Sequence, residues 1–182
     1  KYIVRESGIA KDDIKLISFS AQMHSLIAMD AQHKRLTENL TWADNRASKY
    51  ADLINREHNG FDIYQRTGTP IHPMSPLSKI FWMRHEEPEI FKQTAMFADL
   101  KTYVLFQLYE RFVIDYSLGS ATGMMNLEQL DWDHKALELL SIEKNQLLNV
   151  WHKQREGEKL SEVEELISTK TSELLQQFKA YK

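Results

Sequence analysis

The sequence predicts an α/β fold, in which short strands alternate with helices in one layered domain. Two neighbouring apolar segments, Asp12–Ser20 and Ser25–Asp30, have no helical period and are typical of strands. Helical patterns follow, with apolar residues spaced three and four apart. Further strand-like segments recur between the helices, and this alternation is typical of α/β proteins.

The composition is that of a globular protein and excludes several classes. A length of 182 residues, 42% of them hydrophobic, suffices for one sizeable domain or a domain with an extension. The net charge of -3 comes without a basic cluster, so we expect no nucleic-acid partner. No apolar run approaches the roughly 20 residues that cross a bilayer, and no signal peptide opens the chain. With no cysteine, the chain fits a reducing compartment, and we expect a cytoplasmic protein without membrane contact.

The first half of the chain predicts two helices around the two strands. Residues 1–7 have the pattern of an amphipathic helix, which Gly8 ends. A second helix is predicted from Arg46 to His58, and Asn59–Gly60 stops it. Its apolar residues, three and four apart, are Ala47, Tyr50, Ala51 and Ile54.

The second half continues the alternation. Ser75 is a typical N-cap and Pro76 a typical first helical residue, so a helix begins there and ends before Pro88. Residues 95–112 contain a short strand and a helix, and Val113–Ser117 is a further strand that leads into a flexible segment, 118–125. One side of the helix after Pro76 is predicted to carry Leu77, Ile80, Phe81 and Arg84.

The character of the chain changes from Glu143 on. Helix-forming residues and balanced charges dominate there, and no strand is predicted. Ser161 and Glu164 form a capping box that starts an apolar stripe. We therefore divide the chain into a domain of residues 1–147 and a helical extension of residues 148–182. A solvated extension is the favoured interpretation over one that binds a partner.

The turn between the first two strands is the first candidate site. It presents Gln22, Met23 and His24 between two apolar segments. Loops at strand ends line the ligand crevice of open α/β sheets. His24 could therefore contact a ligand, or it could be a core histidine bonded to backbone, and the residues leave both readings open.

A second candidate is the segment after the second strand, which places Trp42, Asp44 and Arg46 at alternate positions. In an extended segment these three side chains share one face. An Asp–Arg pair beside a tryptophan can hold a polyol, but it can equally be a structural ion pair that caps the next helix. We favour the structural interpretation.

Two lysines and one polar segment complete the candidates. A lone lysine is usually a solvated charge, but we count Lys79, like Trp42, Asp44 and Arg46, among the structural residues of the cleft. Lys101 lies at a strand-to-helix junction where side chains reach a cleft. Asp115 opens a segment with serine, threonine and two glycines that matches no phosphate-binding loop. The histidines have no metal-binding spacing, and no nucleophile elbow occurs. Taken alone, these residues name no reaction.

Four segments nevertheless occur in the order and spacing of a known family. They are "ISFSAQMHSLIAMD", "TWADNRA", "RTGTPIHPMSPLSKIFW" and "DYSLGSATGMMNL". In this respect the chain resembles the FGGY family of carbohydrate kinases over about residues 1–147. Pro76, Lys79 and Trp82 stand at the characteristic positions of its first signature, and "GTPIHPMSPLSK" is most similar to the gluconate branch.

The resemblance implies part of a ribonuclease-H/actin-like domain, followed by the helical extension. It implies phosphoryl transfer from Mg-ATP to a terminal hydroxyl of gluconate, which gives 6-phosphogluconate. Relatives contact sugar through the positions of Met23, His24 and Lys101, and Gln22, His72 and Asp115 complete the expected substrate site. Because a partly buried carboxylate needs charge-assisted donors, Lys101 or His72 is expected to pair with that of gluconate.

Other family motifs are not found in the sequence. The phosphate-binding hairpin "D-I-G-T-T" is expected upstream of Lys1, and the catalytic aspartate and adenosine-binding motifs well after residue 147. We therefore expect a fragment with no catalytic residue, no metal ligand, no tight binding of ATP or Mg²⁺ and no kinase activity alone.

Two other functions fit the residues less well. One is a fragment of a kinase for xylulose or another polyol. The other is a non-catalytic interaction module that uses the C-terminal helices, and a homo-oligomer is one of the partner states that the sequence allows.

Overall fold

The computed structural model describes residues 2–10, 13–14, 19–150, 172–173 and 176. The predicted first helix is confirmed as α1 (Tyr2–Ser7), and Gly8 follows it with φ 67°. The predicted strand Asp12–Ser20 lies largely outside the described residues. Its four described residues are not in a strand, and Phe19 among them is 37% exposed. The capping box at Ser161 lies outside the described residues, as does most of the predicted extension.

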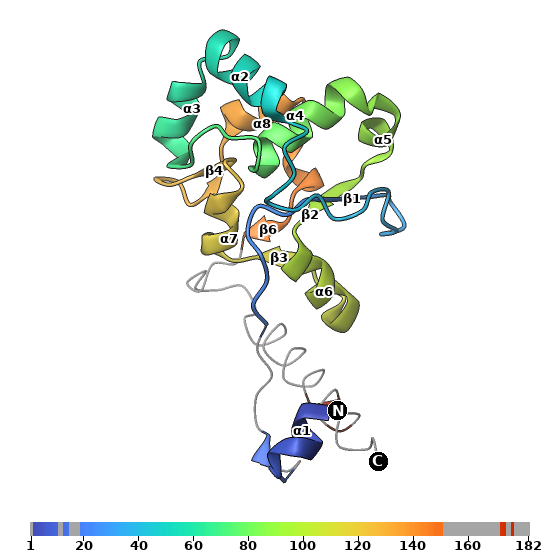
Figure 1. The fold of residues 1–182 in the computed structure, drawn as a ribbon. Coiled ribbons are helices and arrows are strands. Elements are labelled where there is room, and N and C mark those ends of the chain that lie inside the picture. The colour runs from blue at the N-terminus through green and yellow to red at the C-terminus, as the bar shows by residue number, and fades with distance from the viewer. Residues whose placement is uncertain (1, 11–12, 15–18, 151–171, 174–175, 177–182) are drawn as a thin grey trace, which may run out of the picture.

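Short strands and helices are interspersed along the described chain from residue 27 to residue 150, which confirms the α/β class (Figure 1). Strict alternation is not found, because four helices follow the first strand. The elements are β1 (Ile27–Met29), α2 (Ser48–Glu57), α3 (Gly60–Thr67), α4 (Pro76–Glu86), α5 (Pro88–Gln93), β2 (Met96–Ala98), α6 (Leu100–Tyr109), β3 (Val113–Ile114), α7 (Tyr116–Ala121), β4 (Met125–Asn126), β5 (Asp131–Trp132), α8 (His134–Leu140) and β6 (Asn149–Val150). Within the described residues, β1 pairs with β2 and β4 with β5, both antiparallel, whereas β3 and β6 are parallel. None of the described helices is long and apolar enough to cross a membrane.

Helix α4 lies at the centre of the core. The side-chain oxygen of Ser75 accepts from the backbone N–H of Ser78, and Pro76 occupies the first turn, as the sequence predicts. All residues from Pro76 to Met83 are buried, so the prediction that only one side of this helix is apolar and buried is too narrow. Figure 1 shows the reason, because α2, α5 and α8 pack around α4.

Three local predictions are corrected. The strand predicted for Val113–Ser117 ends at Ile114, because the carboxylate of Asp115 accepts from the backbone N–H of Leu118 at 3.0 Å and caps α7. The segment predicted to be flexible, 118–125, holds most of α7 and the start of β4. Helix α3 directly follows Asn59 and was not predicted at all.

A strand also occurs where the sequence predicted none. Asn149–Val150 forms β6 and pairs in parallel with β3. The indole Nε1 of Trp132 donates to the carbonyl of Leu148 at 2.9 Å, which ties the same segment to β5. The two-stranded sheet of β3 and β6 therefore includes residues beyond 147, while the division of the chain into two domains stays a prediction.

Candidate functional site

The site is built around Lys79 of α4, which the sequence analysis counts among the structural residues of the cleft. Its side chain is completely buried, whereas a lone lysine is usually solvated. Its Nζ donates to the backbone carbonyls of His24 at 2.6 Å, Thr41 at 2.8 Å and Leu40 at 3.3 Å. An ammonium group has three N–H donors, so these three acceptors satisfy it. Burial lowers the pKa of Lys79 to about 8, which leaves it mostly charged at neutral pH.

His24 lies in the turn that Lys79 holds, with a positive φ of 58°. Its Nδ1 lies 2.8 Å from the carbonyl of Ala121, the last residue of α7. Because a carbonyl only accepts, Nδ1 carries the hydrogen, and Nε2 of the neutral ring keeps its lone pair. Burial lowers the pKa of His24 and favours that neutral form, although the bond to Ala121 acts in the opposite direction. Lys79 and His72 also lower this pKa electrostatically. The interpretation of His24 as a histidine bonded to backbone is therefore confirmed at Nδ1. A ligand contact through Nε2 stays a prediction.

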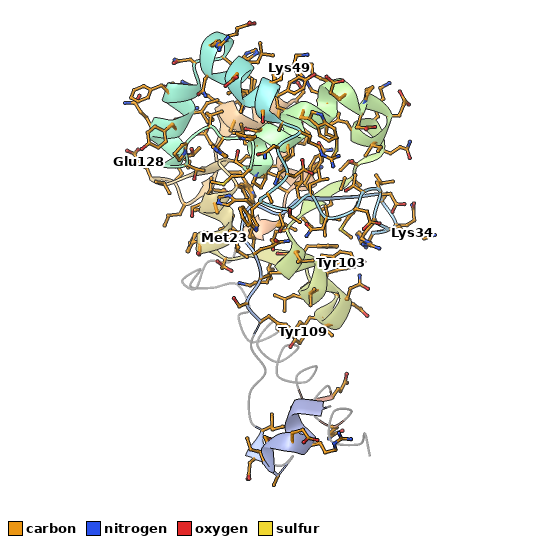
Figure 2. All side chains as sticks on the ribbon, viewed as in Figure 1. Met23, Lys34, Lys49, Tyr103, Tyr109 and Glu128 are labelled. Atoms are coloured by element: carbon orange, nitrogen blue, oxygen red, sulfur yellow. The ribbon has the colours of Figure 1, made fainter. Side chains whose placement is uncertain are left out.

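The turn exposes its other side chains to different degrees. Met23 is 42% exposed, and Figure 2 shows it at the margin of the body beside α7. Gln22 is half-buried, and its carbonyl accepts weakly from the hydroxyl of Ser25 at 3.5 Å. The turn thus presents an apolar side chain directly before the histidine.

His72 reaches the same region from the loop before α4. The hydroxyl of Thr69 donates to the carbonyl of Ser120 at 2.7 Å, and the N–H of Leu77 donates to the carbonyl of Thr122 at 3.0 Å. The first bond fastens this loop to the end of α7, and the second fastens the first turn of α4 to the C-cap of α7. His72 is exposed, and its Nδ1 accepts from the backbone N–H of Met74 at 3.2 Å. Its Nε2 therefore carries the hydrogen in the neutral ring.

Lys101 and Asp115 form a separate part of the candidate site. The Nζ of Lys101 lies 2.5 Å from a carboxylate oxygen of Asp115, and both side chains are partly exposed. Burial opposes ionisation of Asp115, but the hydrogen bond from Lys101 and those from the backbone hold its pKa below the ordinary value. Asp115 caps the start of α7 and His24 binds its last residue, so about 9 Å of helix separates the two groups.

The segment with Trp42, Asp44 and Arg46 contains turns and is not extended, so the condition under which the three side chains would share one face is not met. The predicted ion pair is present, because Nε of Arg46 lies 2.9 Å from both carboxylate oxygens of Asp44. The guanidinium of Arg46 lies over the ring of Trp82, at 4.9 Å from its centroid. Trp42 is 58% exposed and directly follows Thr41, whose carbonyl binds Lys79.

The structure therefore joins Lys79 to His24 and places His72 near enough to lower the pKa of His24, while the Lys101–Asp115 pair lies at the other end of α7. The acceptor that orients His24, the carbonyl of Ala121, was missed by the sequence analysis. No local signal marks it, because the two residues are 97 positions apart. Within the described ranges, no three His, Asp or Glu side chains come close enough to hold a metal ion.

Comparisons with known proteins agree with the sequence motifs. The pattern of the FGGY family of carbohydrate kinases, N-terminal domain, matches residues 1–171. A gluconokinase of Bacillus subtilis (strain 168) is 54% identical over 129 residues, which cover 71% of this chain and 25% of that protein. The chain thus spans about a quarter of the length of the curated relatives it matches.

Two solved structures from Lactobacillus acidophilus are similar in fold. The gluconate kinase has a TM-score of 0.74 and 34% identity, covering 86% of this chain and 33% of its own. The ligand-bound xylulose kinase has a TM-score of 0.74 and 33% identity, with the same two coverages of 86% and 33%.

Proposed function

The chain belongs to the FGGY family of carbohydrate kinases, and from this premise we propose that it supplies part of the sugar-binding half of an ATP-dependent gluconate kinase. The product of that reaction would be 6-phosphogluconate. The chain has part of the ribonuclease-H/actin-like fold of these kinases. The observation that carries the substrate proposal is that His24 and His72 offer opposite hydrogen-bonding groups in one region.

The two histidines suit a ligand that carries both hydroxyls and a carboxylate. Nε2 of His24 would accept from a sugar hydroxyl, and the Nε2–H of His72 would donate to the carboxylate. Protonation of His72 would add a charge-assisted bond, which is the stronger kind. We assign the carboxylate to His72 rather than to Lys101, because Asp115 already neutralises the charge of Lys101.

The remaining candidates would contact the rest of the sugar. Gln22 and Met23 belong to the His24 turn, and Met23 would cover the apolar side of the carbon chain. Lys101 and Asp115, about 9 Å away along α7, would bind hydroxyl groups at the other end of an extended sugar acid. This leaves Asp44 and Arg46 as a structural pair beside the site.

Xylulose is the second candidate substrate, because the xylulose kinase structure is as similar in fold as the gluconate kinase structure. Xylulose has no carboxylate. The role of His72 therefore distinguishes the two substrates, since only gluconate would need a cationic or N–H donor at that position.

The described residues of this chain would bind and orient sugar rather than transfer phosphate. ATP with Mg²⁺ would supply the phosphoryl group in the full-length enzyme. The phosphate-binding hairpin, the catalytic aspartate and the adenosine-binding motifs of the family are not found in the sequence. We therefore propose that the chain alone does not phosphorylate gluconate. A cytoplasmic location and a homo-oligomer stay predictions.

Gluconate affinity in the full-length gluconokinase of Bacillus subtilis, measured by calorimetry, tests the proposal. Alanine at the position aligned with His72 should weaken gluconate binding at least tenfold, or about 1.4 kcal/mol. Alanine aligned with Lys101 should have a smaller effect, and alanine aligned with the exposed Lys92 serves as the control. Unchanged affinity in both the His72 and the Lys101 variants would refute the carboxylate site.

A further inference from the structure

The three carbonyls that accept from Lys79 are not equivalent. The carbonyl of Leu40 also accepts from the N–H of Leu26 at 3.0 Å, and that of Thr41 also accepts from the N–H of Asp44 at 3.1 Å. The carbonyl of His24 makes the shortest of the three bonds, at 2.6 Å. In the part of the chain that the structure describes, Lys79 is the one donor to it. Loss of Lys79 would therefore leave only the carbonyl of His24 without a partner.

The backbone at His24 needs such support. Its φ of 58° lies in the left-handed region, which is uncommon for residues other than glycine, although histidine is among the more tolerant. Strained backbone of this kind persists where surrounding contacts hold it, and it is common at ligand sites. His24 is held at two points, its carbonyl by Lys79 and its ring by the carbonyl of Ala121.

We propose that Lys79 is a positioning residue, which holds the peptide of His24 so that Nε2 of the ring faces the sugar. The inference rests on the sugar site proposed above. Lys79 itself does not touch the ligand, since its side chain is completely buried. It acts through His24, as residues around a binding site commonly act through the groups that they orient.

Lysine suits this role better than an apolar residue or an arginine. An apolar side chain would leave the partly buried carbonyl of His24 without a donor, which is costly. The compact ammonium has three donors that can point in different directions, whereas the guanidinium of arginine is a planar fork suited to carboxylates. The charged and titratable groups that act on Lys79 and His24 are Asp44, Arg46 and His72.

Nuclear magnetic resonance of the Lys79→Met variant tests the proposal on the chain as it exists. Methionine has a similar length but no donor. We expect the carbonyl carbon and ring nitrogens of His24 to shift, while the indole N–H of Trp132 and the Nε–H of Arg66, both bonded elsewhere in the core, stay in place. Lys92→Met, at an exposed lysine of α5, is the matched control and should leave His24 unchanged. Unchanged His24 signals in a folded Lys79→Met variant would overturn the proposal.

An alkaline titration of the unmodified chain gives a second test, which needs no variant to fold. When Lys79 loses a proton, its amine has two N–H groups for three acceptors. The carbonyl carbon of His24 should then move with the same midpoint as the Cε carbon of Lys79. A titrating Lys79 with a stationary His24 carbonyl would contradict the positioning role.

Gluconate affinity separates this inference from the proposed function. If the unmodified chain binds gluconate, Lys79→Met should weaken binding about tenfold, as loss of an orienting residue typically does. If the unmodified chain binds no gluconate, the proposed sugar site is refuted for this chain. The resonance signals of His24 in Lys79→Met still show whether Lys79 positions His24.

Discussion

Two buried charged groups in this protein are compensated in opposite ways. Lys79 donates to three neutral backbone carbonyls, and the nearest charges, Asp44 and Arg46, act on it with opposite signs. Asp133, at the start of α8, instead meets a guanidinium. Arg66 donates to both of its oxygens, through Nε at 2.8 Å and Nη2 at 3.0 Å. We call the first group the lysine cluster and the second the aspartate cluster, which also includes Asn126.

This difference distinguishes the aspartate cluster, a structural hydrogen-bond network, from the lysine cluster, which belongs to the candidate site. Burial opposes ionisation of Asp133, but the hydrogen bonds from Arg66, the backbone of Ala136 and Asn126 outweigh it and hold its pKa below the ordinary value. Burial lowers the pKa of Lys79 to about 8, because the opposing effect of Asp44 is smaller and Arg46 adds to the lowering. A buried ion that is not hydrogen-bonded to a counter-ion is expensive. The hydrogen bond from Lys79 to the carbonyl of His24 gives a physical reason for a lysine at this buried position.

The largest expected effect comes from breaking the aspartate cluster. Asp133→Ala should destabilise the chain by about 3 kcal/mol, because it leaves the guanidinium of Arg66 without its main partner and removes the cap of α8. Urea unfolding measures this loss. Asp62→Ala removes the more exposed carboxylate that contacts the same arginine, and should have little effect. Equal losses in the two variants would show that burial of the pair is irrelevant.

Acid should weaken the same cluster. The folded-state pKa of Asp133 is lowered, so its contribution to stability is complete above the unfolded value of about 3.9 and is lost as the pH falls through the folded value. Unfolding measured from pH 6 to pH 2 should show this loss, and Asp133→Asn should make the decline shallower. A decline of the same slope in that variant would assign acid sensitivity to other carboxylates.

The lysine cluster should matter less for stability. Lys79→Met leaves one carbonyl unpaired but also removes a buried charge, so we expect a net loss of only about 1 kcal/mol at pH 7. The folded pKa of about 8 lies below the ordinary 10.5, so the unfolded chain binds more protons between these values. Stability of the unmodified chain relative to Lys79→Met should therefore rise with pH in that range. If Lys79→Met lost as much unfolding free energy as Asp133→Ala, the proposed difference between the two clusters would be wrong.

The smallest effect is expected at the partly exposed pair of Arg46 and Asp44. Arg46→Met should cost at most about 1 kcal/mol, because ion pairs of this exposure contribute little. Its consequence should instead be local, since Arg46 lies over Trp82 and belongs to the turn that carries Trp42. Tryptophan fluorescence should shift while the unfolding midpoint stays nearly constant. A large stability loss would place this pair with the aspartate cluster.

Local signals explain what the sequence predicted correctly. Helix α4 could be predicted from the residues at its two ends, because capping serines and prolines act on the backbone next to them. These residues are Ser75, Pro76 and Pro88. The burial of Lys79 could not be predicted in this way, because its acceptors come from residues 38 to 55 positions away. The same holds for β6, whose pairing with β3 joins distant segments.

Helix α7 was missed for a different reason. Gly119 and the serines around it favoured a flexible segment, although Asp115 was available as an N-cap. The family motifs led to the members of the candidate site, but only the structure gave their hydrogen-bonding roles. The two histidines differ in which ring nitrogen is occupied, and this depends on Ala121 and Met74 rather than on sequence pattern.

The central claim is that His24 and His72 form one site for a sugar acid. A gluconate titration of the chain with labelled histidine rings, followed by nuclear magnetic resonance, tests it most directly. The account predicts that the signals of His24 and His72 shift together, while those of His58 and His85, which pack against Phe81, stay in place. Shifts at His58 or His85 alone, or none at any histidine at saturating gluconate, would contradict it.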